Sequence, residues 1–142
     1  MTPEQKRLIK ETWSKVVPIA DTAAELFYNR LFEIDPSTRP LFRVTNMAEQ
    51  RKKLVWTLSA ALQSLDNLEA LIPVIETMGR RHRGYGVVDA HYASVGAALL
   101  WTLEKGLGQA WTPQAAAAWT QLYGVLSSTM QRAANEPAKH AA

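Results

Sequence analysis

One histidine in a basic segment is the residue of this chain best suited to bind a metal. The segment ETMGRRHRGYG, residues 76–86, contains His82, one of three histidines among 142 residues. His82 follows Met78 by four positions, so both side chains share an apolar helical face. Arginines stand at positions 80, 81 and 83. An imidazole facing an apolar space, with cations at its edge, suits a flat apolar metal cofactor with peripheral carboxylates, such as haem.

A structural interpretation of His82 stands beside this one. A histidine in the last turn of a helix commonly caps the helix or is solvated, and its positive form interacts favourably with the helix dipole. We expect His91, which points to a different face from its neighbour Tyr92, to be a surface or cap residue. The spacing of these residues alone leaves both interpretations of His82 open.

Other chemistry has little support in the sequence. The chain has no cysteine, which excludes disulfides, zinc thiolates, iron–sulfur clusters and a thiol nucleophile. It also contains no glycine-rich phosphate loop, no His-Glu-x-x-His zinc helix and no serine nucleophile elbow. Hydrolysis and phosphoryl transfer are therefore not indicated.

The elements that would position these residues read as helices almost throughout. Apolar residues recur every three or four positions, with no useful strand alternation, so we predict an all-α chain of about six to eight helices. Thr2 and Thr112 each precede a proline, which predicts two helix starts. Three further helix starts are predicted. Thr22 has capping-box spacing to Glu25, Pro73 is suited to a first helical turn, and Asp89 can cap a helix.

The composition indicates one globular domain, with ordinary shares of hydrophobic and charged residues. Hydrophobic residues make up 47% and charged residues 20%, with a net charge of +3. We expect a domain over residues 1–134 and a short tail over 135–142. The N-terminus lacks a signal-peptide pattern, and no apolar run approaches the ~20 residues of a membrane span, so we expect a cytoplasmic protein without membrane partners. The mild positive charge is weak evidence for nucleic acid, and we expect no such partner.

The landmarks together resemble the globin family over nearly the whole chain. They are Pro36, then Phe42 in PLF, then MGRRH with His82, then Val87, followed by HYASVGAALLWTLEKGLG and TPQAAAAWTQLYGVLSSTM. The last two segments look like flavohaemoglobin-type bacterial globins, their single-domain relatives and neuroglobin. The resemblance implies a globin fold, a 3-on-3 helical sandwich around haem, with His82 as the proximal iron ligand. Without cysteine there is no thioether attachment, so the cofactor would be noncovalent haem b.

The same resemblance assigns roles around the cofactor. It places apolar and aromatic side chains against haem and Arg81 at a propionate; the lining residues are Phe42, Leu54, Leu58, Met78, Val87, Tyr92 and Val95. On the distal side it implies Tyr28 and Gln50, although a one-residue shift in the preceding loop would bring Glu49 or Arg51 there instead. On the proximal side it implies Tyr92 and Glu136, bonded to the far nitrogen of the imidazole.

The function implied by this resemblance is high-affinity oxygen binding and the conversion of nitric oxide to nitrate. Its partners would be oxygen, nitric oxide and other diatomic ligands, together with a separate electron-donating reductase, because the chain ends with the globin domain. The alternative is an oxygen-binding, storage or buffering globin without turnover. A helical interaction or nucleic-acid module that uses the arginines at 80–83 is a further alternative outside haem chemistry.

Overall fold

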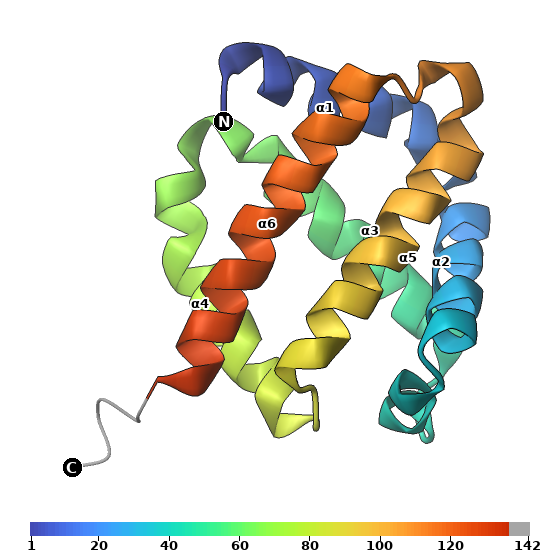
Figure 1. Ribbon diagram of the computed structural model, residues 1–142, viewed down its shortest axis with the longest axis vertical. Helices are drawn as coiled ribbons and strands as arrows, with labels where there is room; N and C mark the ends of the chain where they lie inside the picture. Colours follow the sequence, from blue (N-terminus) through green and yellow to red (C-terminus); the bar gives the residue numbers. More distant parts are fainter. Residues whose placement is uncertain (137–142) are drawn as a thin grey trace.

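The computed structural model describes residues 1–136, and these residues form six α-helices, four short 3-10 helices and no strand (Figure 1). This confirms the all-α prediction. The α-helices are α1 (Pro3–Val16), α2 (Ala20–Ile34), α3 (Met47–Gln63), α4 (Leu68–Gly84), α5 (Asp89–Leu107) and α6 (Pro113–Asn135). The 3-10 helices are η1 (Val17–Ile19), η2 (Pro36–Phe42), η3 (Leu65–Asn67) and η4 (Gly108–Ala110). Among the described residues, no helix is long and apolar enough to cross a membrane.

Two helix starts follow the sequence prediction closely. Thr2 caps α1 and forms a capping box with Gln5, and Pro3 is the first helical residue. Thr112 caps α6 by accepting from the Ala115 N–H, again with proline in the first turn. In both cases the threonine hydroxyl bonds an N–H that lacks an intrahelical partner, while the proline has none to lose.

The predicted start of α2 at Thr22 is wrong. The helix begins at Ala20, and Thr22 is an exposed residue inside its first turn. The reason is the 3-10 turn η1, which leads directly from α1 into α2. The Ala20 N–H bonds the Val17 carbonyl across this turn, so the backbone is already helical before the threonine and needs no side-chain cap.

The predicted start of α4 at Pro73 is also wrong. The helix begins five residues earlier, at Leu68, and continues through Pro73. The N–H that Pro73 lacks would have bonded the carbonyl of Glu69, and both residues are exposed. Water can reach this carbonyl, which reduces the cost of the missing bond. Gly84 ends the helix as predicted, and Gly86 follows with a φ of +98°.

The start of α5 depends on His91 instead of the predicted Asp89 cap. His91 is buried, and its Nδ1 accepts from the Val88 N–H at 3.1 Å. That bond leaves the ring proton on Nε2, which faces Ser37 Oγ at 3.2 Å. Ser37 in turn donates to Asp35, whose pKa is lowered by this hydroxyl and a second one. His91 is therefore a cap, as one of the two sequence interpretations held, and joins the start of η2 to that of α5.

The helices form two layers of three. Figure 1 shows α5 and α6 in front of α3, while α4 contacts α6 and α2 contacts α5. This arrangement places α2, α5 and α6 in one layer and α1, α3 and α4 in the other. One apolar cluster joins α1, α3, α5 and α6; its largest fully buried residues are Trp119, Ile9 and Leu65. A second cluster lies between α2 and α5, around Phe27, Tyr28 and Leu31.

The helix that carries His82 is held against α6 at a glycine. A Cβ atom added to Gly79 would lie 2.3 Å from the backbone oxygen of Met130 and 2.6 Å from its Cα. No side chain fits at this crossing unless the two backbones separate. The approach fixes the position of α4 three residues before His82.

We expect Gly79→Ala to lower the free energy of unfolding by about 1–3 kcal/mol, because the added methyl group overpacks a backbone contact. Urea unfolding of the two proteins measures this change. Gly124→Ala on α6 is the matched control, because its Cβ meets no atom within 4 Å. Gly124→Ala should raise stability by about 0.5–1 kcal/mol through helix propensity. Equal gains for both variants would show that α4 and α6 do not approach in this way.

Candidate functional site

His82 lies in the last turn of α4 with one ring nitrogen already bonded. Its Nδ1 lies 2.6 Å from the carbonyl oxygen of Met78, one turn earlier. A carbonyl only accepts, so Nδ1 carries the proton and donates it. In the neutral ring Nε2 then has a free lone pair, which is the form in which imidazole binds a metal. The side chain is half-buried, so this atom is not sealed inside the core.

The apolar residues predicted around His82 share one level of burial. All six have intermediate exposure, neither core nor surface; they are Phe42, Leu54, Leu58, Met78, Val87 and Val95. They come from η2, α3, α4, the loop after α4, and α5. Apolar side chains that remain partly open on several elements are what an internal cofactor space requires, because a filled core would bury them completely.

On the distal side, the structure brings Tyr28 and Gln50 together. The Gln50 Nε2 donates to the Tyr28 hydroxyl oxygen at 3.1 Å, from α3 to α2. Because the phenol oxygen accepts this bond, its own proton remains available to a ligand. The neighbours of Gln50 have other roles: Glu49 is exposed, and Arg51 pairs with Asp21 at 3.2 Å. The loop register is therefore the one that places Gln50 at Tyr28.

Aromatic packing holds Tyr28 in place. Its ring meets Phe42 at 5.4 Å and 70°, and Phe27 at 4.9 Å and 73°, both edge-to-face. Tyr28 is only 5% exposed. Burial raises the pKa of its hydroxyl, and the bond from Gln50 opposes part of that rise. The phenol is thus neutral, and a hydrogen-bond donor, throughout the physiological range.

Two buried tyrosines and a half-buried one should make the fold sensitive to alkali. Burial is the main cause that raises the pKa of Tyr28, Tyr92 and Tyr123. A raised pKa in the folded state means that the neutral phenols stabilise the fold below their unfolded pKa, about 10. We expect the free energy of unfolding to be unaffected by these groups up to about pH 9, and to fall as pH rises above about 10. Denaturant unfolding from pH 8 to 11.5 measures this. Full ionisation of these tyrosines in the folded protein near pH 10 would contradict it.

The proximal side differs from expectation at one bond. Tyr92 is buried, at 7% exposure, and its hydroxyl has no hydrogen-bond partner in the part of the chain that the structure describes. Its backbone carbonyl accepts from the Tyr123 hydroxyl at 2.5 Å. The single Nδ1 proton of His82 goes to the Met78 carbonyl. The structure does not form the bond expected from Tyr92 to the imidazole, and that role stays a prediction.

Glu136 is the last described residue and lies beyond the end of α6. The helix ends at Asn135, and Glu136 is extended, with φ −74° and ψ 142°, as favoured before the proline at 137. Its predicted role at the imidazole stays a prediction. Of the predicted tail, 135–142, residues 137–142 lie outside the described part of the chain.

The arginines around His82 have separate roles. Arg83 donates to the Ala134 carbonyl at 2.6 Å and to Asn135 Oδ1 at 2.9 Å, so it ties α4 to the end of α6. Arg80 and Arg81 are exposed, and neither forms an ion pair with another described residue. Arg81 is therefore available to an anionic group, and its contact with a propionate stays a prediction.

Among the described residues, the all-α fold combines a metal-competent imidazole at His82, partly exposed apolar residues on several helices and a hydrogen-bonded polar pair at Tyr28 and Gln50. Helical haem proteins use this combination of groups. Comparison with known proteins agrees. The globin family model matches residues 25–130. Neuroglobin of Tetraodon nigroviridis is 30% identical over 145 residues, covering 93% of this chain and 91% of that protein. The chain belongs to the globin family, and is thus a haem-binding, oxygen-binding protein.

One further sequence relative and two solved structures are also similar to this chain. A flavohemoprotein of Bacillus subtilis (strain 168) is 34% identical over 122 residues, which is 84% of this chain and 31% of that protein. A bacterial globin from Campylobacter jejuni has a TM-score of 0.80 at 24% identity, covering 94% of this chain and 96% of that one. A hexacoordinated heme protein from an anhydrobiotic tardigrade has a TM-score of 0.84 at 17% identity, covering 96% of both chains. These two structures show a shared fold.

The donor set of this chain fits haem. His82 would hold the iron of haem through Nε2, because its Nδ1 is already bonded to the Met78 carbonyl. The apolar residues predicted to line the cofactor are partly exposed, as side chains that would pack against a porphyrin ring need to be. Tyr28 and Gln50 are bonded to each other, and their role as donors to a diatomic ligand stays a prediction.

Proposed function

We propose that this globin binds noncovalent haem b and oxygen with high affinity, and that it converts nitric oxide to nitrate. Haem, when bound, supplies the iron at which oxygen and electrons are exchanged. The observation that carries the proposal is the distal pair, in which Gln50 donates to Tyr28 and leaves the phenol proton for a ligand.

The distal pair acts by retaining oxygen. A ligand that gains negative charge in a buried pocket is stabilised by a hydrogen bond from a neutral donor. Such a bond is worth about 1–3 kcal/mol, or roughly one to two decades in affinity. Gln50 fixes the phenol oxygen, so the donor is oriented before the ligand arrives. Slow release suits consumption of a scarce second reactant better than delivery of oxygen.

The proximal residues belong to the same proposal. By the flavohaemoglobin-type resemblance, Tyr92 and Glu136 would share the Nδ1 proton of His82 with the Met78 carbonyl. This would increase electron density on the imidazole and so favour oxygen activation. The Tyr92 hydroxyl, which has no hydrogen-bond partner among residues 1–136, supports this assignment. A buried hydroxyl without a partner costs about 1–3 kcal/mol, and a bond to the proximal group would remove that cost.

The proposed reaction combines one nitric oxide, one oxygen molecule and one electron to give one nitrate ion. The oxygen–oxygen bond breaks, and both oxygen atoms end on nitrogen. Each turnover therefore needs an electron from outside the described site. We propose a separate reductase as its source, which makes this protein one half of a two-component system. This half would hold the reactants, and the reductase would supply the electron.

Steady-state nitric oxide consumption tests the proposal. The ferrous protein is supplied with oxygen, an excess of a flavin reductase with its reduced nicotinamide cofactor, and repeated pulses of nitric oxide. We expect many nitrate ions per haem, with the rate limited by the supply of electrons. One nitrate per haem, despite complete re-reduction between pulses, would overturn catalysis and favour the oxygen storage or buffering function.

A further inference from the structure

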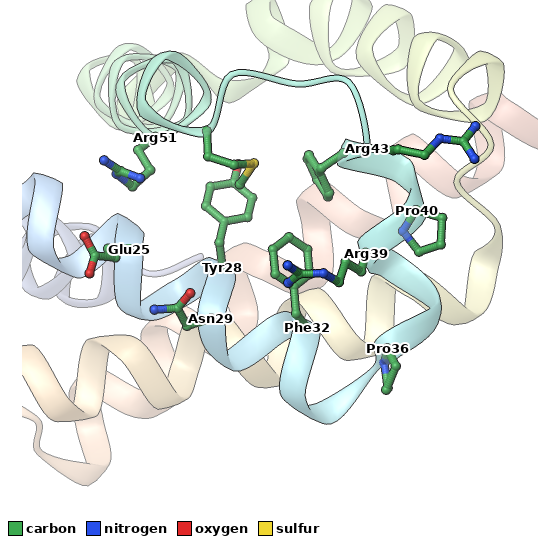
Figure 2. Close-up of a pocket in the computed structure, with 11 residues that line it drawn as sticks. Glu25, Tyr28, Asn29, Phe32, Pro36, Arg39, Pro40, Arg43 and Arg51 are labelled. Atoms are coloured by element: carbon green, nitrogen blue, oxygen red, sulfur yellow. The ribbon is translucent and has the colours of Figure 1, made fainter.

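A cavity of about 640 Å³ opens beside Tyr28, between α2, η2 and the start of α3 (Figure 2). We refer to it as the α2–η2 cavity. Its lining includes Tyr28, Phe32 and Phe42, together with Arg39 and Arg51. His82 is not among the lining residues, so this space is distinct from the proximal site. The volume is within the range of small-molecule sites, about 300–1,000 Å³.

The inner wall of the cavity is aromatic. The rings of Phe32 and Phe42 are 5.6 Å apart, and that of Tyr28 is 5.4 Å from Phe42 and 6.2 Å from Phe32. Tyr28 is buried, whereas Phe32 and Phe42 remain partly exposed. Pro36 and Pro40 extend the wall along η2. Rigid rings that stay partly open offer a surface for another flat ring at low cost in side-chain entropy.

A cation lies over this wall. The guanidinium carbon of Arg39 is 5.3 Å from the centre of the Phe32 ring, and Figure 2 shows the two side chains overlapping at the middle of the cavity. No carboxylate of residues 1–136 pairs with Arg39. Stacking on the ring orients the guanidinium and leaves its N–H groups free for an anion.

The charges on the other side of the cavity are largely compensated. Arg51 pairs with Asp21, and Glu25 is the single carboxylate of the lining. Figure 2 shows Glu25 and Arg51 together, away from Arg39, and shows the guanidinium of Arg43 pointing away from the cavity. The uncompensated charge inside the cavity is therefore that of Arg39, and it is positive.

We propose that the α2–η2 cavity binds a small aromatic carboxylate. Its ring packs against Phe32 and Phe42, and its carboxylate accepts hydrogen bonds from Arg39. An arginine presents two parallel N–H groups that match a carboxylate, and an aromatic wall favours a flat ligand body over a flexible one. Tyr28 lines this cavity and also belongs to the distal pair, so the ligand would lie directly against the oxygen-binding side.

Calorimetric titration of the ferric haem-loaded protein with 1-naphthoate tests this site. We expect a Kd of about 1 mM or below for a ligand of this size. Two compounds separate the contributions of the ligand: 1-naphthalenemethanol keeps the ring without the charge, and inorganic phosphate keeps a charge without the ring. Each should bind at least about fivefold more weakly, because it lacks one of the two interactions.

Variants identify the residue that binds the anion. Arg39→Gln removes an exposed cation and should weaken naphthoate binding about five- to tenfold. Arg132→Gln, an exposed arginine on α6 outside the lining, is the matched control and should bind as the unaltered protein does. Equal affinity of Arg39→Gln, equal binding of the alcohol, or no binding of naphthoate would overturn the proposal. Displacement of naphthoate by cyanide would also overturn it, because it would place the ligand at the iron.

Discussion

Replacing His82 with glycine should abolish stable haem binding, the largest effect we expect from a single substitution. Among the described residues, His82 is the half-buried histidine whose Nδ1 is bonded to a carbonyl and whose Nε2 is left free. Loss of the protein ligand removes the bond that anchors iron, so haem affinity should fall more than about 100-fold. Haem transfer to an excess of an apo-acceptor globin, followed at the Soret band, measures the change.

Imidazole added to His82→Gly should restore much of the original spectrum, because glycine leaves a space of the size of the lost ring. His91→Gln is the matched control. His91 is buried, whereas His82 is half-buried, and the His91 ring bonds the Val88 N–H and faces Ser37. That variant should lose stability while it retains one haem per chain. If His82→Gly kept its haem with an unchanged spectrum, His82 would not be the iron ligand.

Much of the fold could be predicted from local signals. Thr2 and Thr112 gave correct helix starts, because a hydroxyl cap followed by proline acts within one turn. Thr22 and Pro73 misled, because the backbone there was set by its surroundings. A preceding 3-10 turn made the cap at Thr22 unnecessary. Pro73 and Glu69, whose carbonyl loses its bond, are both exposed, so a proline inside the helix is tolerated there. Local patterns mark sites where a helix can start, but neighbouring elements decide which of them is used.

For the candidate site, the sequence indicated which residues to consider but not the contacts between them. Spacing and family resemblance named His82, Tyr28 and Gln50 as candidates, and their roles stay predictions. The protonation of His82 depends on a carbonyl one turn earlier, and the Gln50 bond depends on how α2 and α3 approach each other. The α2–η2 cavity arises where Phe32 and Arg39 meet across a helix boundary, and no single segment contains that signal. Contacts between elements are the part that pattern reasoning does not reach.

The second large effect concerns oxygen release from the distal side. Tyr28→Phe keeps the ring and its packing against Phe42 but removes the hydroxyl that would donate to a charged ligand. The oxygen dissociation rate should rise about 10- to 100-fold, which corresponds to one such bond. Stopped-flow mixing of the oxygenated protein with carbon monoxide measures this rate. Tyr85→Phe is the control, because Tyr85 is 64% exposed and lies after α4; its rate should not change.

Gln50→Leu then shows whether the two distal residues act as one unit. Gln50 donates to the Tyr28 oxygen, so its loss should release the phenol from its fixed orientation and raise the dissociation rate as well. If the main role of Gln50 is to position Tyr28, the substitution should have little further effect in a chain that already carries Tyr28→Phe. The two changes would then be strongly non-additive. Additive effects would show that each residue contacts the ligand independently, and an unchanged rate in Tyr28→Phe would remove the distal assignment altogether.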